Sequence, residues 1–205
     1  MRLALACEGA ALPADLLELL AAAGLPEAPL RAAVSPALVL VGEVEWLLAP
    51  GADVLAVCLC GAADAGIVGK DLLLEHEPDI YELLDLGVAR QRLVYATSAS
   101  AARSARQRPR LATRYPRVTR RHFAASGRQV EPLTLSAPGL LVALGFADGV
   151  IELEHLLPQG EDALVVREQV AVCSARLVAG RQARALQGAG LAKLIDRLRE
   201  GGGDT

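Results

Sequence analysis

Short apolar runs alternate with amphipathic segments along this chain of 205 residues. Leu3–Ala6, Ala65–Val68 and Gly149–Leu153 are typical of strands, whereas Pro13–Ala23 and Leu191–Glu200 carry leucines at helical spacing. Strands that alternate with helices favour a parallel or mixed sheet covered by helices. Aromatic residues make up only 3% of the chain, so alanine, leucine and valine must build the core. We therefore expect an α/β fold and not an aromatic-rich β-sandwich.

The segment Ser98–Pro109 consists mainly of serine, alanine and arginine without apolar periodicity, and it predicts an exposed loop or hinge. Groups of strands and helices precede and follow it, which suggests two lobes with a cleft between them. Before it, Ile80–Leu84 and Arg92–Ala96 are expected to form a strand pair, and after it Val170–Val178 is expected to be one strand. The apolar stretch Asp53–Cys60 fits either a short helix capped by Asp53 or a strand, and periodicity does not decide between them.

Charge is unevenly distributed, although the net charge is only −3. No acidic residue lies between Asp85 and Glu131, and the same interval holds eleven arginines, at positions 90, 92, 103, 106, 108, 110, 114, 117, 120, 121 and 128. One interpretation is a solvated basic face. The other is a field that attracts polyanions, nucleotides before RNA. Because few aromatic residues are available for stacking on bases, we expect no nucleic-acid partner.

The cysteines and apolar runs bear on the cellular compartment. None of Cys7, Cys58, Cys60 and Cys173 forms a CxxC pair, and the histidines show no metal-ligand spacing with them, so reduced buried thiols are expected. Cys58 and Cys60 alternate along an apparent strand, so we expect them to point to the same face. No apolar run reaches the roughly 18 residues that a membrane helix needs. The apolar part of the start, MRLALAC, is too short for a signal peptide. We expect a cytoplasmic protein without a membrane partner.

Two places along the chain are candidates for ligand binding. At the first, Gly69, Lys70 and Asp71 follow a buried strand; the glycine allows a close ligand and the lysine offers a positive charge, although such turns are also common as plain structure. At the second, Asp148 and Glu152 accompany the strand Gly149–Leu153, which runs into a Pro/Gly turn. A strand that leads into a loop before a helix is where α/β proteins hold phosphorylated ligands. The alternative for this acidic pair is a capping or solvated role.

Four segments together are more specific than either place alone. GIVGKDLLLEHEPDIYELLDLGVARQRLVYA, RLATRYPRVTRRHFAASGRQVEPLTL, GFADGVIEL and CSARLVAGR occur in this order. Over roughly residues 61–199 the chain resembles the short form of ATP phosphoribosyltransferase. The resemblance implies two periplasmic-binding-protein-like (type II) α/β lobes with a cleft between them. The first lobe would comprise residues 1–93 plus 176–205, and the second residues 94–175.

The resemblance also implies an activity. This glycosyltransferase moves the phosphoribosyl group of phosphoribosyl pyrophosphate to N1 of ATP and releases pyrophosphate, the first step of histidine biosynthesis. Mg2+ would accompany the substrates, and a regulatory subunit similar to histidyl-tRNA synthetase would complete a homo- or hetero-oligomer. By position, Gly69, Lys70, Asp71, Asp148 and Glu152 would bind substrate; Glu152 stands where the family has aspartate. No catalytic residue and no metal ligand is assigned.

The chain departs from the family pattern where phosphate is held. The Thr-Gly-x-Thr positions fall on Leu156–Gln159, or in a shifted alignment on Gln159–Asp162. The family's Pro-Lys-Gly-Arg appears as Ala6–Ala10 without a cation, and Pro50 takes the place of an arginine. An acidic position falls on Gly139 or Leu140. These changes suggest an alternative function, a catalytically impaired paralogue that serves as a nucleotide-binding or regulatory and assembly subunit. A small-ligand binding protein with the same fold is a third option.

Overall fold

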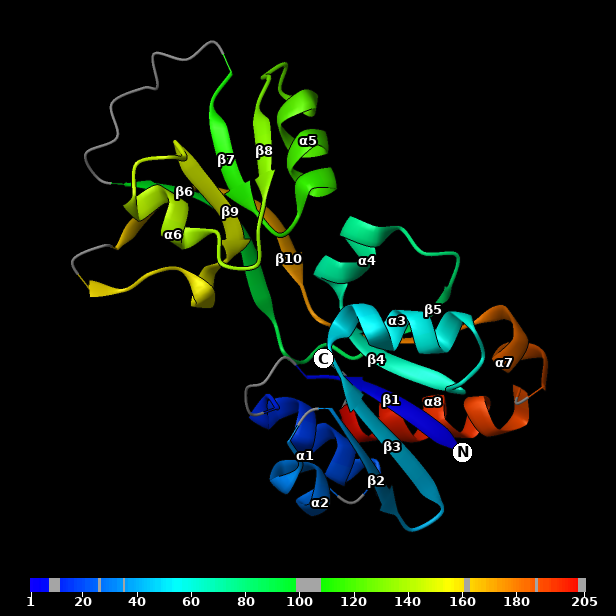
Figure 1. Ribbon diagram of the computed structural model, residues 1–205. Coiled ribbons are helices and arrows are strands. Elements are labelled where there is room, and N and C mark those ends of the chain that lie inside the picture. The colour runs from blue at the N-terminus through cyan, green and yellow to red at the C-terminus, as the bar shows by residue number, and fades with distance from the viewer. Residues whose placement is uncertain are drawn as a thin grey trace. The chain divides into compact units, whose positions relative to one another are not determined.

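A computed structural model describes residues 1–7, 12–25, 27–34, 36–98, 108–160, 163–186 and 188–202. The chain divides into two compact units, which Figure 1 shows as ribbons. Unit 1 comprises Met1–Leu73, Glu77–Arg90 and Ser174–Thr205, and unit 2 comprises Leu74–His76 and Gln91–Cys173. Most of the expected loop at Ser98–Pro109 falls on residues 99–107, outside the described residues.

Unit 1 is built on a six-stranded mixed sheet with the order β2-β3-β1-β4-β11-β5. Its strands are β1 (Arg2–Ala6), β2 (Ala37–Val41), β3 (Val44–Ala49), β4 (Ala65–Gly69), β5 (Tyr81–Asp85) and β11 (Ala175–Ala179). Strands β1, β3 and β4 run parallel, so their carboxyl ends meet at one edge of the sheet. Strands β2 and β3 form an antiparallel hairpin, and Gly42 takes the positive φ of 61° that its turn requires.

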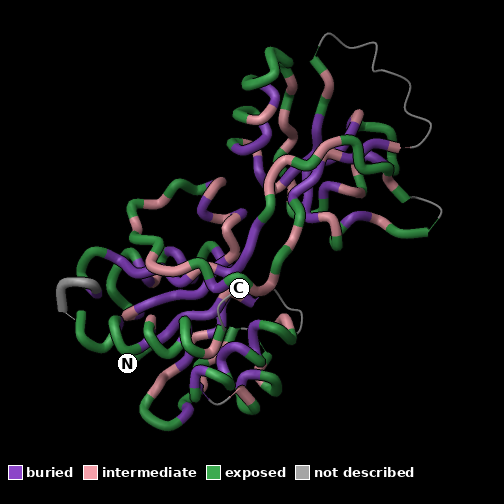
Figure 2. The backbone as a smooth tube through the Cα atoms, turned by 180° about the vertical axis from the view of Figure 1, so that it is seen from behind, coloured by how far each residue is buried: buried purple, intermediate pink, exposed green. Residues whose placement is uncertain are grey.

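Helices cover both faces of this sheet because side chains alternate along its strands. Leu3 and Leu5 join the leucines of α1 (Ala14–Ala22) and α8 (Gly188–Gly202) on one face. Ala4, between them, packs on the other face with α3 (Gly51–Leu59) and the start of α4 (Lys70–His76). The shorter helices are α2 (Ala28–Ala32) and α7 (Arg181–Leu186). Figure 2 shows the buried strands in purple and the exposed helix residues in green.

Unit 2 contains a five-stranded sheet with the order β10-β6-β9-β7-β8. Its strands are β6 (Gln91–Ser98), β7 (Arg110–Thr113), β8 (Glu131–Thr134), β9 (Gly149–Leu153) and β10 (Leu164–Cys173). Strands β7, β8 and β9 are parallel, whereas β6 is antiparallel to both β9 and β10. Leu111 and Ile151 pack against α5 (Pro116–Ala125), whereas Ala112 and Val150 pack against α6 (Gly139–Ala143). Both faces of this sheet are therefore covered as well.

Two strand predictions were wrong. The expected pair at 80–84 and 92–96 does not form, because β5 pairs with β11 in unit 1 whereas β6 pairs with β9 and β10 in unit 2. The expected single strand at 170–178 is two strands, β10 and β11, which belong to different sheets and are separated by Ser174. Both errors arise where the chain passes from one unit to the other. The apolar pattern of the sequence does not change at these points, so it gives no sign that a strand ends there or belongs to another sheet.

The ambiguous stretch at 53–60 is helix α3, which follows Pro50 and has no side-chain cap from Asp53. Cys58 is buried and Cys60 is exposed, so the expectation of one shared face was wrong. Cys7, Cys58 and Cys173 are buried free thiols, and burial together with Cys60 raises the pKa of Cys58 to about 12. Within the described ranges, no helix combines the length and apolar character needed to span a bilayer.

Candidate active site

The turn from β4 into α4 is tightly built at the edge where the parallel strands of unit 1 end. A Cβ on Gly69 would lie 2.1 Å from the Oδ1 atom of Asp71, so a larger residue here would displace the Asp71 carboxylate from its folded-back position. Asp71 is only 8% exposed. The backbone N–H of Lys70 donates to the carbonyl oxygen of Ser174, 3.0 Å away, and ties the turn to the beginning of β11. The backbone of this turn is therefore fixed before any ligand arrives.

The Lys70 side chain belongs to a charge network on the same edge. Its Nζ atom lies 2.6 Å from Oε2 of Glu82, and Nη1 of Arg176 lies 2.8 Å from Oε1 of the same carboxylate. The Nη2 atom of Arg176 also contacts Asp85, at 2.8 Å. Two cations and two carboxylates balance one another. An anionic ligand that displaced Glu82 would meet Lys70 and Arg176 together, which is a suitable arrangement for a phosphate.

Asp85 anchors the other end of this network. Burial would raise the pKa of its carboxyl, but hydrogen bonds from the Gly87 N–H and the Ser174 hydroxyl, together with Arg176, lower that pKa below its ordinary value. The Ser174 hydroxyl donates to Oδ1 of Asp85 at a distance of 2.7 Å. The Nε atom of Arg176 is buried and has no hydrogen-bond partner among the residues that the structure describes. Arg176 is thus held firmly by its Nη atoms while one donor remains unused.

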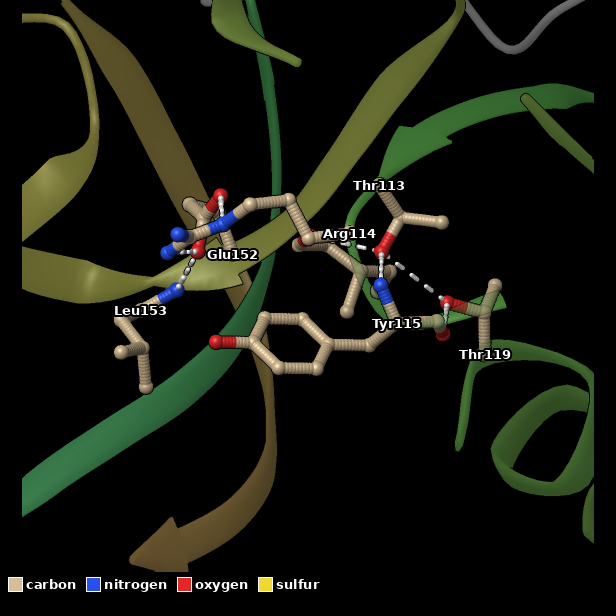
Figure 3. Close-up of polar contacts among 7 residues, drawn as sticks. Thr113, Arg114, Tyr115, Thr119, Glu152 and Leu153 are labelled. Carbon is tan, nitrogen blue, oxygen red and sulfur yellow. Dashed lines mark hydrogen bonds and ion pairs between the residues drawn. The ribbon is translucent and has the colours of Figure 1, made fainter. Parts of the chain in front are cut away.

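In unit 2, a buried polar corner follows the carboxyl end of β7 (Figure 3). The Thr113 hydroxyl donates to the carbonyl of Ile151 at 2.9 Å and accepts from the N–H of Tyr115 at 2.8 Å. The Thr119 hydroxyl donates to the carbonyl of Tyr115 at 2.7 Å. Both threonines are 0% exposed. These bonds lock β7 to β9 and fix the start of α5.

Glu152 is held by Arg114 at this corner. The guanidinium donates from Nε to Oε2 at 2.9 Å and from Nη2 to Oε1 at 2.8 Å, and Oε1 also accepts the N–H of Leu153. Figure 3 shows the two side chains joined in this fork. The Arg114 side chain is 23% exposed, and the Glu152 side chain is 4% exposed. The Glu152 carboxylate therefore fixes the position of Arg114 and of the backbone at Leu153, and Arg114 is the more exposed of the two side chains.

The structure does not bring Asp148 and Glu152 together. Asp148 precedes β9, where its Oδ2 accepts the N–H of Arg110 at 2.7 Å and its own N–H donates to the Arg110 carbonyl. Glu152 lies near the opposite end of the strand. The two carboxylates thus fasten β9 to β7 at opposite ends.

The segment after Glu152 is anchored by one apolar side chain, that of Leu157, whereas Leu156 is 49% exposed. It forms the 3-10 turn η1 (Glu154–Leu156), and Leu157 is buried in the cluster beneath α6. A Cβ on Gly139 would lie 2.7 Å from Cγ of Pro158, so the glycine gives the proline room. The shifted alternative includes residues 161–162, which lie outside the described residues. In the described part, no hydroxyl is displayed on this segment.

The amino end of α5 is already occupied by a carboxylate. Glu75, 9% exposed, accepts the N–H groups of Arg117 and Val118 at 3.0 Å. A helix amino terminus attracts anions through its free N–H groups and its dipole. Glu75 thus takes the position that a ligand anion could otherwise occupy within unit 2.

Comparison with known proteins decides the family. A family model described as HisG, ATP phosphoribosyltransferase, matches residues 50–200. The ATP phosphoribosyltransferase of Symbiobacterium thermophilum is 40% identical over 162 residues, which cover 76% of this chain and 73% of that protein. The chain belongs to the ATP phosphoribosyltransferase family.

Solved structures of this family and of binding proteins share the fold. The ATP phosphoribosyl transferase (HisG:HisZ) complex from Thermotoga maritima contains a chain that matches with a TM-score of 0.76 at 20% identity, covering 98% of both chains. The periplasmic aliphatic sulphonate binding protein SsuA from Escherichia coli matches with a TM-score of 0.62 at 13% identity, covering 98% of this chain and 72% of that one. The expected periplasmic-binding-protein-like α/β class is confirmed.

The sequence analysis identified two candidate substrate-binding residues of this ATP phosphoribosyltransferase family member but not their ion-pair partners. Lys70 was identified without Glu82, and Glu152 without Arg114. The register of β7 on β9 pairs Thr113 with Ile151, so the next residues in each strand are Arg114 and Glu152. Pairing the predicted strand Gly149–Leu153 in parallel with a strand at Arg110–Thr113 would have revealed this contact, but no local pattern fixes which strands are neighbours.

The arginine-rich interval is partly neutralised in this family member. Arg92, Arg110, Arg114 and Arg128 each pair with a glutamate, namely Glu154, Glu131, Glu152 and Glu168. Each of these glutamates lies outside the interval or at its end. These four arginines carry little net charge to attract a polyanion. The two interpretations, a solvated basic face and a field that attracts polyanions, therefore concern the arginines that do not pair with a glutamate.

Proposed function

We propose that the protein acts as a short-form ATP phosphoribosyltransferase. It transfers the phosphoribosyl group of phosphoribosyl pyrophosphate to N1 of ATP and releases pyrophosphate, the first step of histidine biosynthesis in the cytoplasm. The observation that carries the proposal is the family match over residues 50–200, which includes the Gly69–Asp71 turn and the strand between Asp148 and Glu152.

The reaction requires positioning and charge more than covalent chemistry. The anomeric carbon becomes cation-like as pyrophosphate leaves, so the protein must hold the phosphates and align the adenine nitrogen. In this proposal the Gly69 and Asp71 backbone forms a close surface for substrate, and Lys70 releases Glu82 to contact phosphate. The substrate-binding roles expected for Asp148 and Glu152 remain a prediction, and Arg114 is the group through which Glu152 would act.

Mg2+ enters with the substrates in this proposal. In the ranges that the structure describes, no three side chains of His, Cys, Asp or Glu gather to hold a metal ion. Glu152 is engaged by Arg114 and Asp148 by the backbone of Arg110. Mg2+ commonly binds substrate phosphates with few protein ligands, so we assign it to pyrophosphate and to no residue.

A regulatory subunit similar to histidyl-tRNA synthetase is the proposed partner. The solved neighbour from Thermotoga maritima is a HisG:HisZ complex, and this chain matches 98% of its matched chain. The expected assembly is a hetero-oligomer in which that partner supplies feedback control.

One observation favours a second function, that of a nucleotide-binding or assembly subunit with impaired catalysis. Leu156, Leu157 and Pro158 occupy the segment where the resemblance places threonine hydroxyls, and Leu157 and Pro158 are used in packing. Leucine and proline side chains cannot donate hydrogen bonds to a phosphate. Such a subunit would bind ATP yet form no product.

The test is formation of phosphoribosyl-ATP, followed by absorbance, with the full chain alone and with its synthetase-like partner. Lys70→Met is expected to lower kcat/KM by about 10- to 100-fold, because one charge-assisted contact to phosphate is lost. Lys193→Met, on the exposed side of α8, is the matched control and should leave the rate unchanged. No product under either condition rejects the enzyme, and ATP binding by calorimetry then supports the second function.

A further inference from the structure

A second basic site lies in unit 2, separate from the corner around Arg114 and Glu152. It is a pocket of about 300 Å3 beside α5 and the entry to β8, lined by Arg108, Arg120, Ala124, Arg128, Gln129 and Val130. Arg108 precedes the amino end of β7, whereas Arg114 follows its carboxyl end. The proposed transfer chemistry uses none of these lining residues.

Arg128 forms a fixed wall of the pocket. Its Nη1 and Nη2 atoms contact Glu168, at 2.5 Å and 2.7 Å, and its Nε atom donates to the Ser126 hydroxyl. The guanidinium also lies over the ring of Phe123, 4.4 Å from its centroid. Glu168 additionally contacts His122 at 3.0 Å. The Arg128 side chain is therefore fixed in position and its charge is balanced by Glu168, so it forms part of the pocket wall and adds little net charge.

Arg108 and Arg120 supply the net charge. Both are exposed, and neither forms an ion pair or hydrogen bond with another residue of the described ranges. The adjacent carboxylate, Glu131, is engaged by Arg110 at 3.2 Å. Arg120 and Ala124 are four residues apart on α5, so the small alanine leaves room beside the guanidinium. The pocket is therefore lined by two arginines that have no ion-pair or hydrogen-bond partner among the described residues, next to the fixed wall of Arg128.

We propose that this pocket binds a small anion with two linked phosphate groups, either inorganic pyrophosphate or the diphosphate of a nucleotide. Each guanidinium can hold a phosphate through two parallel hydrogen bonds, and the Gln129 amide offers a further donor. The volume lies at the small end of the range for ligand pockets, which suits a compact diphosphate. No carboxylate occurs between Asp85 and Glu131 to compete from within that stretch of sequence.

The experiment titrates the full chain with inorganic pyrophosphate, and separately with ADP, in a calorimeter. Phosphoribosyl pyrophosphate is left out, because its own diphosphate could fill the pocket, and the variants show whether binding belongs to the pocket or to the proposed transfer site. Arg108→Ala with Arg120→Ala removes both free cations. Lys193→Ala with Arg199→Ala is the matched control, since it removes two exposed cations from α8 of unit 1. Sulfate in place of pyrophosphate measures general anion attraction.

The wild-type chain is expected to bind one pyrophosphate or ADP under these conditions, and the Arg108/Arg120 variant to bind at least about tenfold more weakly. The α8 variant should bind as the wild type does. Stronger binding of ADP than of pyrophosphate identifies the nucleotide as the source of the diphosphate. Equal or weaker binding of ADP shows that the nucleoside adds nothing, which identifies inorganic pyrophosphate. The proposal is overturned by absence of binding in the wild type, by equal loss in both double variants, or by sulfate binding as tightly as pyrophosphate. Formation of phosphoribosyl-ATP by the same samples tests the proposed function independently.

Discussion

At the scale of single residues, the Arg114–Glu152 pair makes the sharpest prediction. Glu152→Gln keeps the shape of the side chain but leaves the Arg114 guanidinium, only 23% exposed, without its counter-charge. We expect the free energy of unfolding to fall by about 3 kcal/mol, because the charge of a poorly solvated guanidinium loses the carboxylate that balances it in a two-bond fork. Chemical denaturation followed by circular dichroism measures this change.

A matched control comes from the pair of Glu27 and Arg31, four residues apart on the helical segment around α2, in which the arginine that would lose its partner is 48% exposed. Glu27→Gln should cost no more than about 0.5 kcal/mol, since exposed pairs contribute little. Arg114→Met combined with Glu152→Leu should recover much of the loss, because an apolar pair leaves no buried charge. If the double variant is as unstable as the sum of its single variants, the pair is not the source of the effect.

Glu168 predicts a dependence of stability on pH. The hydrogen bond from Arg128, aided by His122, outweighs burial and lowers the pKa of this carboxyl to about 2. A lowered folded-state pKa means that the stabilisation is fully present above the ordinary value of 4.5 and is lost as pH falls from there towards 2. Glu168→Gln should remove this part of the acid sensitivity. Unfolding curves between pH 6 and pH 3 test it, and parallel pH profiles for variant and wild type would contradict it.

At the scale of elements, the capping of α5 depends on a residue distant in sequence. The Glu75 carboxylate accepts the N–H groups of Arg117 and Val118 at the first turn. Glu75→Ala is expected to destabilise unit 2 by about 1–2 kcal/mol, as loss of a helix cap does. Hydrogen exchange at these two amides should accelerate. Glu18→Ala, at an exposed position of α1, is the control and should leave both amides unchanged.

Elements defined by local pattern were predictable, and those defined by partners were not. The turn at Gly42, the leucine face of α1 and the strand at Ala65 follow from spacing and turn residues that act over a few positions. The break at Ser174 and the pairing of β5 with β11 depend on contacts across about ninety residues of chain. The same division applies to the site, where Lys70 and Glu152 were visible in the sequence but their counter-ions Glu82 and Arg114 were not.

At the scale of the whole molecule, each unit has hydrophobic cores of its own. Leu5 and Trp46 belong to the unit 1 core beneath α1 and α8, and both are 0% exposed. Leu111, also 0% exposed, belongs to the unit 2 core beneath α5. Regions with separate cores can unfold as separate cooperative steps. Trp46 is the only tryptophan in the chain, so its fluorescence follows unit 1 alone.

Leu111→Ala and Leu5→Ala should each destabilise their own unit by about 2–5 kcal/mol, the cost of a cavity in a packed core. With Leu111→Ala, part of the transition seen by circular dichroism should move to lower denaturant while the Trp46 fluorescence midpoint stays in place. With Leu5→Ala the fluorescence midpoint should move. Leu140→Ala, at an exposed position of α6, should move neither signal. If Leu111→Ala shifts fluorescence and circular dichroism equally, the units unfold together, and stability predictions for one unit then apply to the entire chain.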